Sequence, residues 1–529
     1  MAANLTGMTG DRRLICAVAV AVFSLVFLVF SRSLGGEFLG WDDWGLLVDN
    51  PRLVFSPANL WWMLTHSFHG PYQPVAWLSL GLDRLIWGLD PFGFHLTANL
   101  LHASTAVLCF LWARSLAGYL APGLSLKRQV LAGVAVALLF ALHPLRVETT
   151  SWLSARRDQL MGLFTMACLL AYHRVAPRFL EREMPFRAAK NAVVFFLLAC
   201  LSKAPAVTVT VVLVVLDLQV YRRFSTLGFA ARVWRGIGEK SGFFLAGLGV
   251  GLVAVVSQKF AGGGMLSFSD YGLEARLAQS ALSLSLMLKQ IFWPDALSPL
   301  VELRFVPSFR HASELGSLIF LSAVSFLFWY WRKKWPALLA AWTVFVVCSL
   351  PTAGLMQTGQ QLIADRYAYL PSLPWAVLAG LSLLALPAAQ ARFPRRLLTA
   401  GWRLLLTVML VILTVLTWRQ QGVWRNTENL WRQVLALDEA NYTARIALAR
   451  TLVAEKRSDE AATLLMGATR LREEAPDAWL ELGKIELNAG RCQHAVVAFR
   501  QALKFRPQDG EASRGLRRAL EDLEGSKRK

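Results

Sequence analysis

Two adjacent carboxylates, Asp42 and Asp43, are the residues of this chain whose type and position best suit catalysis. They follow the first long apolar run and lie between Trp41 and Trp44. Neighbouring acids raise each other's pKa, and both lose hydration near lipid, so such a pair is costly to keep beside a membrane. The pair therefore predicts a general base, and the alternative is a solvated loop acid or a helix cap.

A second group of candidates is cationic and lies in other polar segments between apolar runs. Guanidinium groups bind phosphate oxygens through paired hydrogen bonds, so arginines kept at a membrane edge indicate an anionic partner. The alternative is a salt bridge of Arg146 or Arg157 with Glu148 or Asp158. The expected phosphate-binding residues are Arg156, Arg157, Lys203 and Arg366.

Further polar residues lie at the start of the second apolar run. His95, Asn99 and His102 are spaced i, i+4 and i+7, which places them on one face of a helix. They could contact a substrate or form hydrogen bonds between helices. The full set of expected substrate contacts is Tyr72, His95, Asn99, His102, His143, Glu148, Asp365 and Tyr367.

Metal and nucleotide chemistry receive little support from the sequence. His66 and His69 alone are a weak metal pair, and none of the six cysteines has metal-ligand spacing, so we expect no metal ligands, zinc site or disulfide framework. A phosphate-binding loop would be Gly-rich and followed by a lysine, and the sequence contains no such pattern. Gly262 to Gly264 lacks the following lysine and is expected to be a flexible outer loop. We expect no cofactor, and a requirement for a divalent metal stays open.

The elements that must position these residues are predicted to be membrane helices. Of the 529 residues, 55% are hydrophobic and only 17% are charged, which is typical of an all-α polytopic membrane protein. Residues 1–424 hold 36 of the 55 Lys and Arg residues but 19 of the 35 Asp and Glu residues. The basic excess thus belongs to the apolar part, where membrane orientation explains it better than nucleic-acid binding does.

About eleven apolar runs approach or reach the ~17–25 residues that cross a bilayer. The first is expected to be a retained span, because no small-residue cleavage site follows it. If the basic clusters lie in the cytoplasm, the N-terminus is also inside and the ambiguous run 277–293 does not cross the membrane. The acid pair and the cations then lie on the outer face. The runs are 14–30, 95–113, 129–142, 159–172, 189–202, 204–220, 241–257, 313–331, 337–350, 369–389 and 402–418.

The remaining residues, 425–529, are predicted to form a short tetratricopeptide-repeat (TPR) domain on the outer face. Trp479, Gly483, Ala495, Phe499 and Pro507 occupy the offsets at which two helices of such a repeat interlock. A weaker copy and a half repeat precede them, and the alternative is an unrelated helical hairpin. Because repeats need neighbours to bury a core, we expect them to pack against one another and against the outer loops.

Together these segments resemble the transmembrane-and-TPR (TMTC-like) glycosyltransferases, which have the GT-C fold and are similar to protein O-mannosyltransferases. The resemblance rests on residues 38–44, 72–74, 95–102, 143–158 and 365–372 and covers nearly the whole chain. It implies a transmembrane glycosyltransferase domain over 1–424, with a first outer loop at 32–93. It also implies a polyprenyl- or dolichyl-phosphate sugar donor, an inverting transfer and Asp42 or Asp43 as the base.

The short repeat domain looks more bacterial than eukaryotic. This indicates a bacterial inner membrane with a cytoplasmic N-terminus and a periplasmic TPR domain that recruits a protein or glycan acceptor. The expected partners are membrane lipid, the lipid-linked sugar and that acceptor, with no nucleic acid. Two rival functions stay open: a non-enzymatic TPR scaffold for envelope assembly and a transporter of lipid-linked sugar.

Overall fold

The computed structural model describes residues 2–68, 70–260, 267–269, 271–357, 359–384 and 393–527. Helices dominate these residues, and the two strands among them, β1 (Val301–Glu302) and β2 (Gln361–Ile363), are very short. The predicted all-α class is therefore confirmed. The predicted loop at Gly262 to Gly264, residues 385–389 of the run 369–389 and His69 lie outside the described residues.

The chain divides into two compact units. The first comprises residues 1–37, 42–297 and 303–424, and the second comprises 38–41, 298–302 and 425–529. The helices of the first unit are α1 (Ala2–Phe30), α2 (Pro57–Thr65), α3 (Pro74–Trp87), α4 (Pro91–Leu120), α5 (Leu126–Ala141), α6 (Val147–Ser151), α7 (Arg156–His173), α8 (Phe186–Ser202), α9 (Val209–Val215), α10 (Phe229–Glu239), α11 (Ser241–Phe260), α12 (Leu273–Phe292), α13 (Ala312–Tyr330), α14 (Pro336–Ser349), α15 (Leu373–Leu381) and α16 (Phe393–Gln420).

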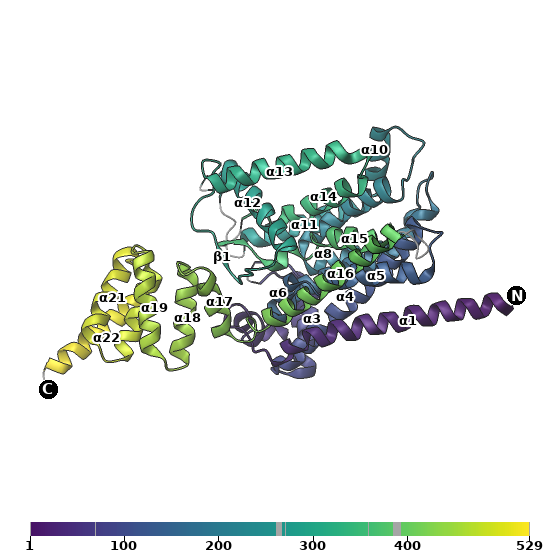
Figure 1. Ribbon diagram of the computed structural model, residues 1–529. Coiled ribbons are helices and arrows are strands. Elements are labelled where there is room, and N and C mark those ends of the chain that lie inside the picture. The colour runs from purple at the N-terminus through teal and green to yellow at the C-terminus, as the bar shows by residue number, and fades with distance from the viewer. Residues whose placement is uncertain are drawn as a thin grey trace. The chain divides into compact units, whose positions relative to one another are not determined.

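Several helix starts of the first unit follow from local chemistry. Proline is the first residue of α3, α4 and α14, where the missing amide proton costs no hydrogen bond. The carboxylate of Asp90 caps α4 by accepting a hydrogen bond from the Phe92 amide at 3.0 Å. The axes of the long helices α1, α4, α13 and α16 are roughly aligned with one another (Figure 1).

Close packing holds α4 at the centre of this unit, against α1, α5 and α7. A Cβ added at Gly133 of α5 would lie 2.8 Å from the Cβ of Arg114 and 2.9 Å from its backbone nitrogen. Only glycine therefore allows α5 to approach α4 this closely, which is a common device between membrane helices.

Fewer helices qualify as bilayer spans by length and hydropathy than the eleven runs expected. Five helical segments of the described residues qualify, or up to seven if each of two bent pairs counts as one span. The difference arises partly because some runs form short or bent elements. The expected span 204–220, for example, is a 3-10 turn at Ala204–Thr208 followed by α9 and a π-helical turn. Pro205 lies in the 3-10 turn, and its missing amide proton disfavours a regular α-helix there.

The second unit contains α17 (Thr427–Leu437), α18 (Tyr442–Ala454), α19 (Ser458–Leu471), α20 (Pro476–Asn488), α21 (Cys492–Phe505) and α22 (Gly510–Lys527). Consecutive helices pack against each other from α17 to α22. Phe499 of α21 is 1% exposed, and Cβ atoms added at Gly483 or Gly515 would lie 2.7 and 2.4 Å from its ring. The ring thus fills a space that two glycines leave open.

Two short segments from distant parts of the sequence complete the second unit. The backbone amide of Gly40 donates a hydrogen bond to the Thr427 hydroxyl at 2.8 Å. The Glu302 carboxylate accepts hydrogen bonds from Thr443 at 2.9 Å and from Arg472 at 3.0 Å. Residues 38–41 and 298–302 are therefore integral to this helical unit.

Candidate functional site

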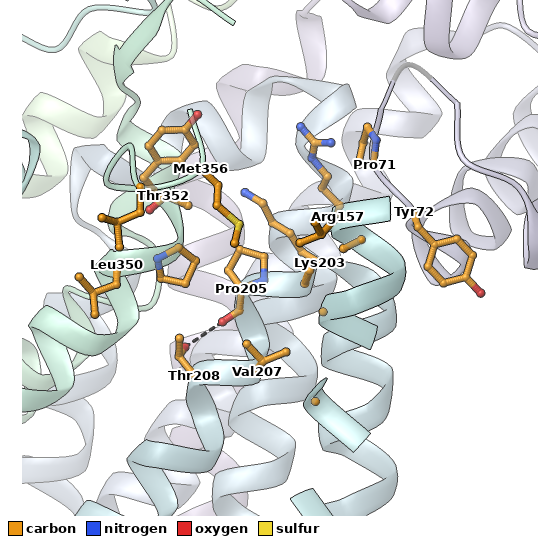
Figure 2. A pocket seen from close by; sticks show the side chains of 18 of the residues that line it. Pro71, Tyr72, Arg157, Lys203, Pro205, Val207, Thr208, Leu350, Thr352 and Met356 are labelled. Carbon is orange, nitrogen blue, oxygen red and sulfur yellow. Dashed lines mark hydrogen bonds between the residues drawn. The ribbon is translucent and has the colours of Figure 1, made fainter. Parts of the chain in front are cut away.

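A cavity of about 810 Å³ lies within the first unit and is polar at one end. Its polar lining comes from the segment before α3, the start of α7, the end of α8, Gln357 and the segment 361–367. Figure 2 shows Arg157 and Lys203 close together, with Thr208 and Leu350 further along the wall. The charged, amide and tyrosine residues of the lining are Tyr72, Gln73, Arg157, Lys203, Gln357, Gln361, Arg366 and Tyr367.

The rest of the cavity wall is mainly apolar, apart from Ser202, Thr208, Thr210 and Thr352. It comes mainly from one side of α11, from α9 with the turn before it, and from the end of α14. Gly247 and Gly251 are one helical turn apart on α11, and a Cβ added at Gly251 would meet nothing within 4 Å. The cavity therefore combines a cationic end with an apolar channel.

Lys203 forms the best-defined charge contact at the cationic end. Its side chain is 14% exposed, and the ammonium group lies 2.5 Å from the Asp158 carboxylate. Burial lowers the pKa of Lys203 from its usual 10.5 to about 8, with Arg157 adding to the shift and Asp158 opposing it. Arg157, 21% exposed, donates a long hydrogen bond of 3.4 Å to Gln73. Both cations keep access to the cavity.

Arg366 is the third cation and is more firmly held. Its guanidinium group pairs with the Glu148 carboxylate, and its backbone amide donates to the other oxygen of that carboxylate at 2.7 Å. Burial alone would lower the pKa of Arg366, but the negative charge of Glu148 raises it, so the guanidinium stays charged. It also lies over the rings of Trp152 and Tyr367, 4.9 Å from each centroid.

Asp365, beside this pair, is buried without a hydrogen-bond partner among the described residues. Burial, and then the negative charge of Glu148, raises the pKa of Asp365 well above its usual value. Asp365 does not line the cavity, whereas its neighbours Arg366 and Tyr367 do. Of these three consecutive residues, which the sequence groups in one motif, only Arg366 and Tyr367 face the cavity.

The two acids of the pair have different surroundings. Asp43 is fully buried and accepts hydrogen bonds from the backbone amide of Ser154 at 2.9 Å and from its hydroxyl at 2.5 Å. Asp42 is partly exposed. Neither lines the cavity, but Ser154 lies only three residues before Arg157, which does. Asp43 is therefore fixed to the segment that leads into the cationic end.

Other expected site residues make contacts outside the cavity. Arg156 is buried and pairs with Asp83 at 2.6 Å, although its neighbour Arg157 faces the cavity. Consecutive residues on a helix point about 100° apart, which accounts for this difference. The salt bridge that the sequence left open for Arg157 is also present, since its Nε lies 3.8 Å from the Asp158 carboxylate.

Four of the polar residues expected to contact substrate are buried within the first unit. Asn99 donates to the Phe30 carbonyl at 3.0 Å, His102 contacts the Ala141 carbonyl at 3.0 Å, and His143 contacts the Ile291 carbonyl at 3.0 Å. His95 is fully buried beside Gly36. None of the four lines the cavity, and their roles as substrate contacts stay predictions.

Several cavity residues were not singled out from the sequence. Gln357 and Gln361 belong to a chain of amide hydrogen bonds in which Gln279 donates to Gln357 at 2.7 Å and Arg366 donates to Gln361 at 2.9 Å. Isolated glutamines carry no recognisable spacing, so the sequence offers no signal for them. The i, i+4 pair Gly247 and Gly251 on an apolar helix was a usable signal. Across the described parts of the chain, no three His, Cys, Asp or Glu side chains converge as metal ligands would.

Comparison with known proteins adds a family relationship to this geometry. No protein-family model matches the chain. It is 25% identical over 496 residues to the protein O-mannosyl-transferase TMTC4 of Homo sapiens, covering 84% of this chain and 64% of that protein. It is 24% identical to Tmtc3 of Drosophila melanogaster, covering 94% of this chain and 59% of that protein. The homologues of this chain are TMTC proteins.

A shorter match has higher identity. It is 30% identical over 182 residues to TMTC1 of Homo sapiens, covering 31% of this chain and 19% of that protein. The TMTC-like resemblance inferred from the motifs is confirmed by these relatives. The chain spans less than two thirds of the length of each of them.

Proposed function

We propose that this TMTC-like chain is a membrane glycosyltransferase that moves a sugar from a polyprenyl-phosphate donor to an acceptor hydroxyl. The observation that carries the proposal is the cavity, in which three cations at one end adjoin a long apolar wall. A lipid-linked phosphate sugar has matching chemistry, since it joins an anionic group to a hydrocarbon chain. The three cations are Arg157, Lys203 and Arg366.

The donor phosphate would lie at the cationic end. Arg157 and Lys203, although both pair with Asp158, keep part of their side chains exposed to the cavity, whereas Arg366 is held more deeply by Glu148 and supplies a fixed positive charge. The isoprenoid chain would lie along α11, where Gly251 leaves open space. Apolar burial of the chain then contributes most of the affinity, and the cations set its direction.

The reaction would be a single displacement with inversion. A carboxylate, Asp42 in our assignment, takes the proton of the acceptor hydroxyl as its oxygen attacks the anomeric carbon. The bond from that carbon to the phosphate oxygen breaks, and the electron pair leaves with the lipid phosphate. Arg157, Lys203 and Arg366 offset the charge that develops on this leaving group. Asp43, anchored to Ser154, holds the base in position.

Mannose and a protein acceptor are the substrates suggested by the relatives, each of which is named a protein O-mannosyl-transferase. We further propose that the second unit recruits the acceptor as a TPR domain. In this proposal the reaction occurs on the periplasmic face of a bacterial inner membrane, and the N-terminus is cytoplasmic.

The test is transfer by the purified full chain reconstituted in lipid. A synthetic polyprenyl-phosphate mannose carrying a radiolabel is incubated with acceptor peptides or glycans, and labelled product is measured. Arg157→Ala should raise the KM for the donor, because a phosphate contact is lost before and during transfer. The matched control is Arg174→Ala, since Arg174 directly follows the opposite end of the same helix.

Two results would contradict the proposal. One is a folded, reconstituted chain that releases no labelled product from several polyprenyl-phosphate sugars with protein and glycan acceptors. The other is donor kinetics that Arg157→Ala and Arg174→Ala change equally, since the cavity would then have no special part in donor binding.

A further inference from the structure

An exposed amphipathic surface lies at the end of the first unit away from the cationic end of the cavity. We call it the basal patch, defined as α10 with residues 180–187 and Arg222. Helices α7 and α8 both connect the two places. Helix α7 carries Asp158 in its first turn and ends at His173, and α8 begins at Phe186 and ends next to Lys203. Each spans about 25 Å at 1.5 Å per residue, close to the thickness of a bilayer core.

Helix α10 has two chemically distinct faces. Phe229, Val233 and Ile237 follow each other at i, i+4 and i+8, with Trp234 on the same side, whereas Arg232, Arg235 and Glu239 lie opposite. Phe229 is 71% exposed and Trp234 is 73% exposed. Among the described residues of the first unit, therefore, little covers these two rings, which lie on the helix before the apolar helix α11.

The angle of α10 suits a helix lying along a membrane surface. The axis bends by 60° between α10 and α11, so the two do not form one straight span. Figure 1 shows α10 at the opposite end of this unit from α3 and α6. A short helix with an aromatic face and arginines opposite it is typical of the interface between headgroups and hydrocarbon.

A buried ion network fixes this angle. Arg223 pairs with Asp217 at 2.8 Å and with Glu239 at 2.6 Å, and Lys240 pairs with the same two acids at 2.7 and 2.8 Å. The hydroxyl of Tyr172, at the end of α7, donates to Asp217. Because these groups are buried and mutually neutralised, α10 is held rigidly at its junction with α11.

The segment 180–187 belongs to the same surface. Its Leu180 carbonyl accepts from the Phe224 amide at 2.6 Å, and its Met184 amide donates to Glu239 at 3.0 Å. Phe186 is 64% exposed and adds a further aromatic ring. The exposed cations of the patch are Arg182, Arg187, Arg222 and Arg235, against the exposed acids Glu181 and Glu183.

We propose that the basal patch binds the anionic headgroups of membrane phospholipids. The aromatic rings insert at the level of the headgroups, and the surplus arginines pair with phosphates and other negative groups. Charge complementarity selects this occupant over a zwitterionic lipid. The proposal goes beyond sugar transfer and requires no bound donor.

The experiment uses the purified full chain in mixed micelles with equimolar phosphatidylglycerol and phosphatidylcholine. Native mass spectrometry counts the lipids of each kind retained per chain. The wild type should prefer phosphatidylglycerol, and Arg182→Gln, Arg187→Gln and Arg222→Gln together should reduce that preference about tenfold or more, since each basic residue near an anionic surface contributes appreciably. These side chains are exposed, so folding should survive, which a thermal unfolding scan checks.

The matched control removes three exposed arginines from the second unit, with Arg514→Gln, Arg517→Gln and Arg518→Gln. It should keep the preference of the wild type. An equal loss in both triple variants, or no preference in the wild type, would overturn the proposal. Trp234→Ala provides a second arm, because it should weaken retention without changing charge; unchanged retention would contradict insertion of the aromatic face.

Discussion

Changing the charge of Lys203 by pH should move donor affinity and protein stability in opposite directions. At neutral pH the ammonium group faces the cavity beside Asp158, and its pKa is about 8 instead of the usual 10.5. As pH rises through about 8 the folded chain loses this charge. Losing one charge-assisted contact to a phosphate typically costs about 1.5–3 kcal/mol, so affinity should fall about 10- to 150-fold.

Stability should rise over part of the same range. Between pH 8 and 10.5 the unfolded chain keeps a proton on this lysine that the folded chain has lost. Unfolding then takes up a proton, so its free energy increases with pH. A pKa difference of this size corresponds to at most about 3–4 kcal/mol of stability. Well below pH 8 the lysine is protonated in both the folded and the unfolded chain, so the free energy of unfolding no longer changes with pH through this group.

The assay measures the Kd of a short-chain polyprenyl phosphate for the purified full chain between about pH 6.5 and 10. Lys203→Arg should abolish the alkaline loss of affinity, because a guanidinium stays charged over this range. The matched control is Lys190→Arg, on the helix α8 that Lys203 directly follows, and it should retain the loss. Affinity that is constant from pH 7 to 10 in the wild type, or an alkaline loss that persists in Lys203→Arg, would refute the reasoning.

Three other changes have defined outcomes. Asp42→Asn should lower turnover by ~10²–10⁴-fold and Asp43→Asn by less, and wild-type rates in both would remove the pair from the mechanism. Phe499→Ala should destabilise the second unit by about 3–5 kcal/mol in denaturant unfolding, and a loss below 1 kcal/mol would mean that its core readily collapses. Cys492, partly accessible, should react with an impermeant thiol reagent in intact spheroplasts; reaction only after permeabilisation would reverse the expected orientation.

The positions of most helices could be predicted from the sequence, because apolar runs of sufficient length have few other structures available. The runs 189–202 and 313–331 match α8 and α13 closely, whereas α4 extends beyond both ends of the run 95–113. The run 204–220 does not form one regular helix. A 3-10 turn that contains Pro205 precedes α9, and a π-helical turn follows it. Hydropathy averages over such turns and therefore could not predict them.

The side chains of the site were predictable by type but not by direction. The sequence could not separate Arg156 from Arg157, because which of them faces the cavity depends on the rotation of α7. It also could not pair Glu148 with Arg366, since 218 residues separate them and only the packing of distant segments brings them together. The part of the wall that α11 supplies was not identified, because its Leu, Val, Phe and Gly residues look like any apolar span until packing shows which side faces the cavity.

The packing around Phe499 has a consequence for how the second unit opens. Its ring lies against Gly483 of α20 and Gly515 of α22, so one side chain on α21 joins three successive helices. Local opening of any one of them exposes this ring to water and removes the contacts of the other two. The amides of α20 to α22 should therefore exchange with solvent deuterium as one cooperative unit, whereas helices in a repeat array otherwise tend to open progressively from the free end.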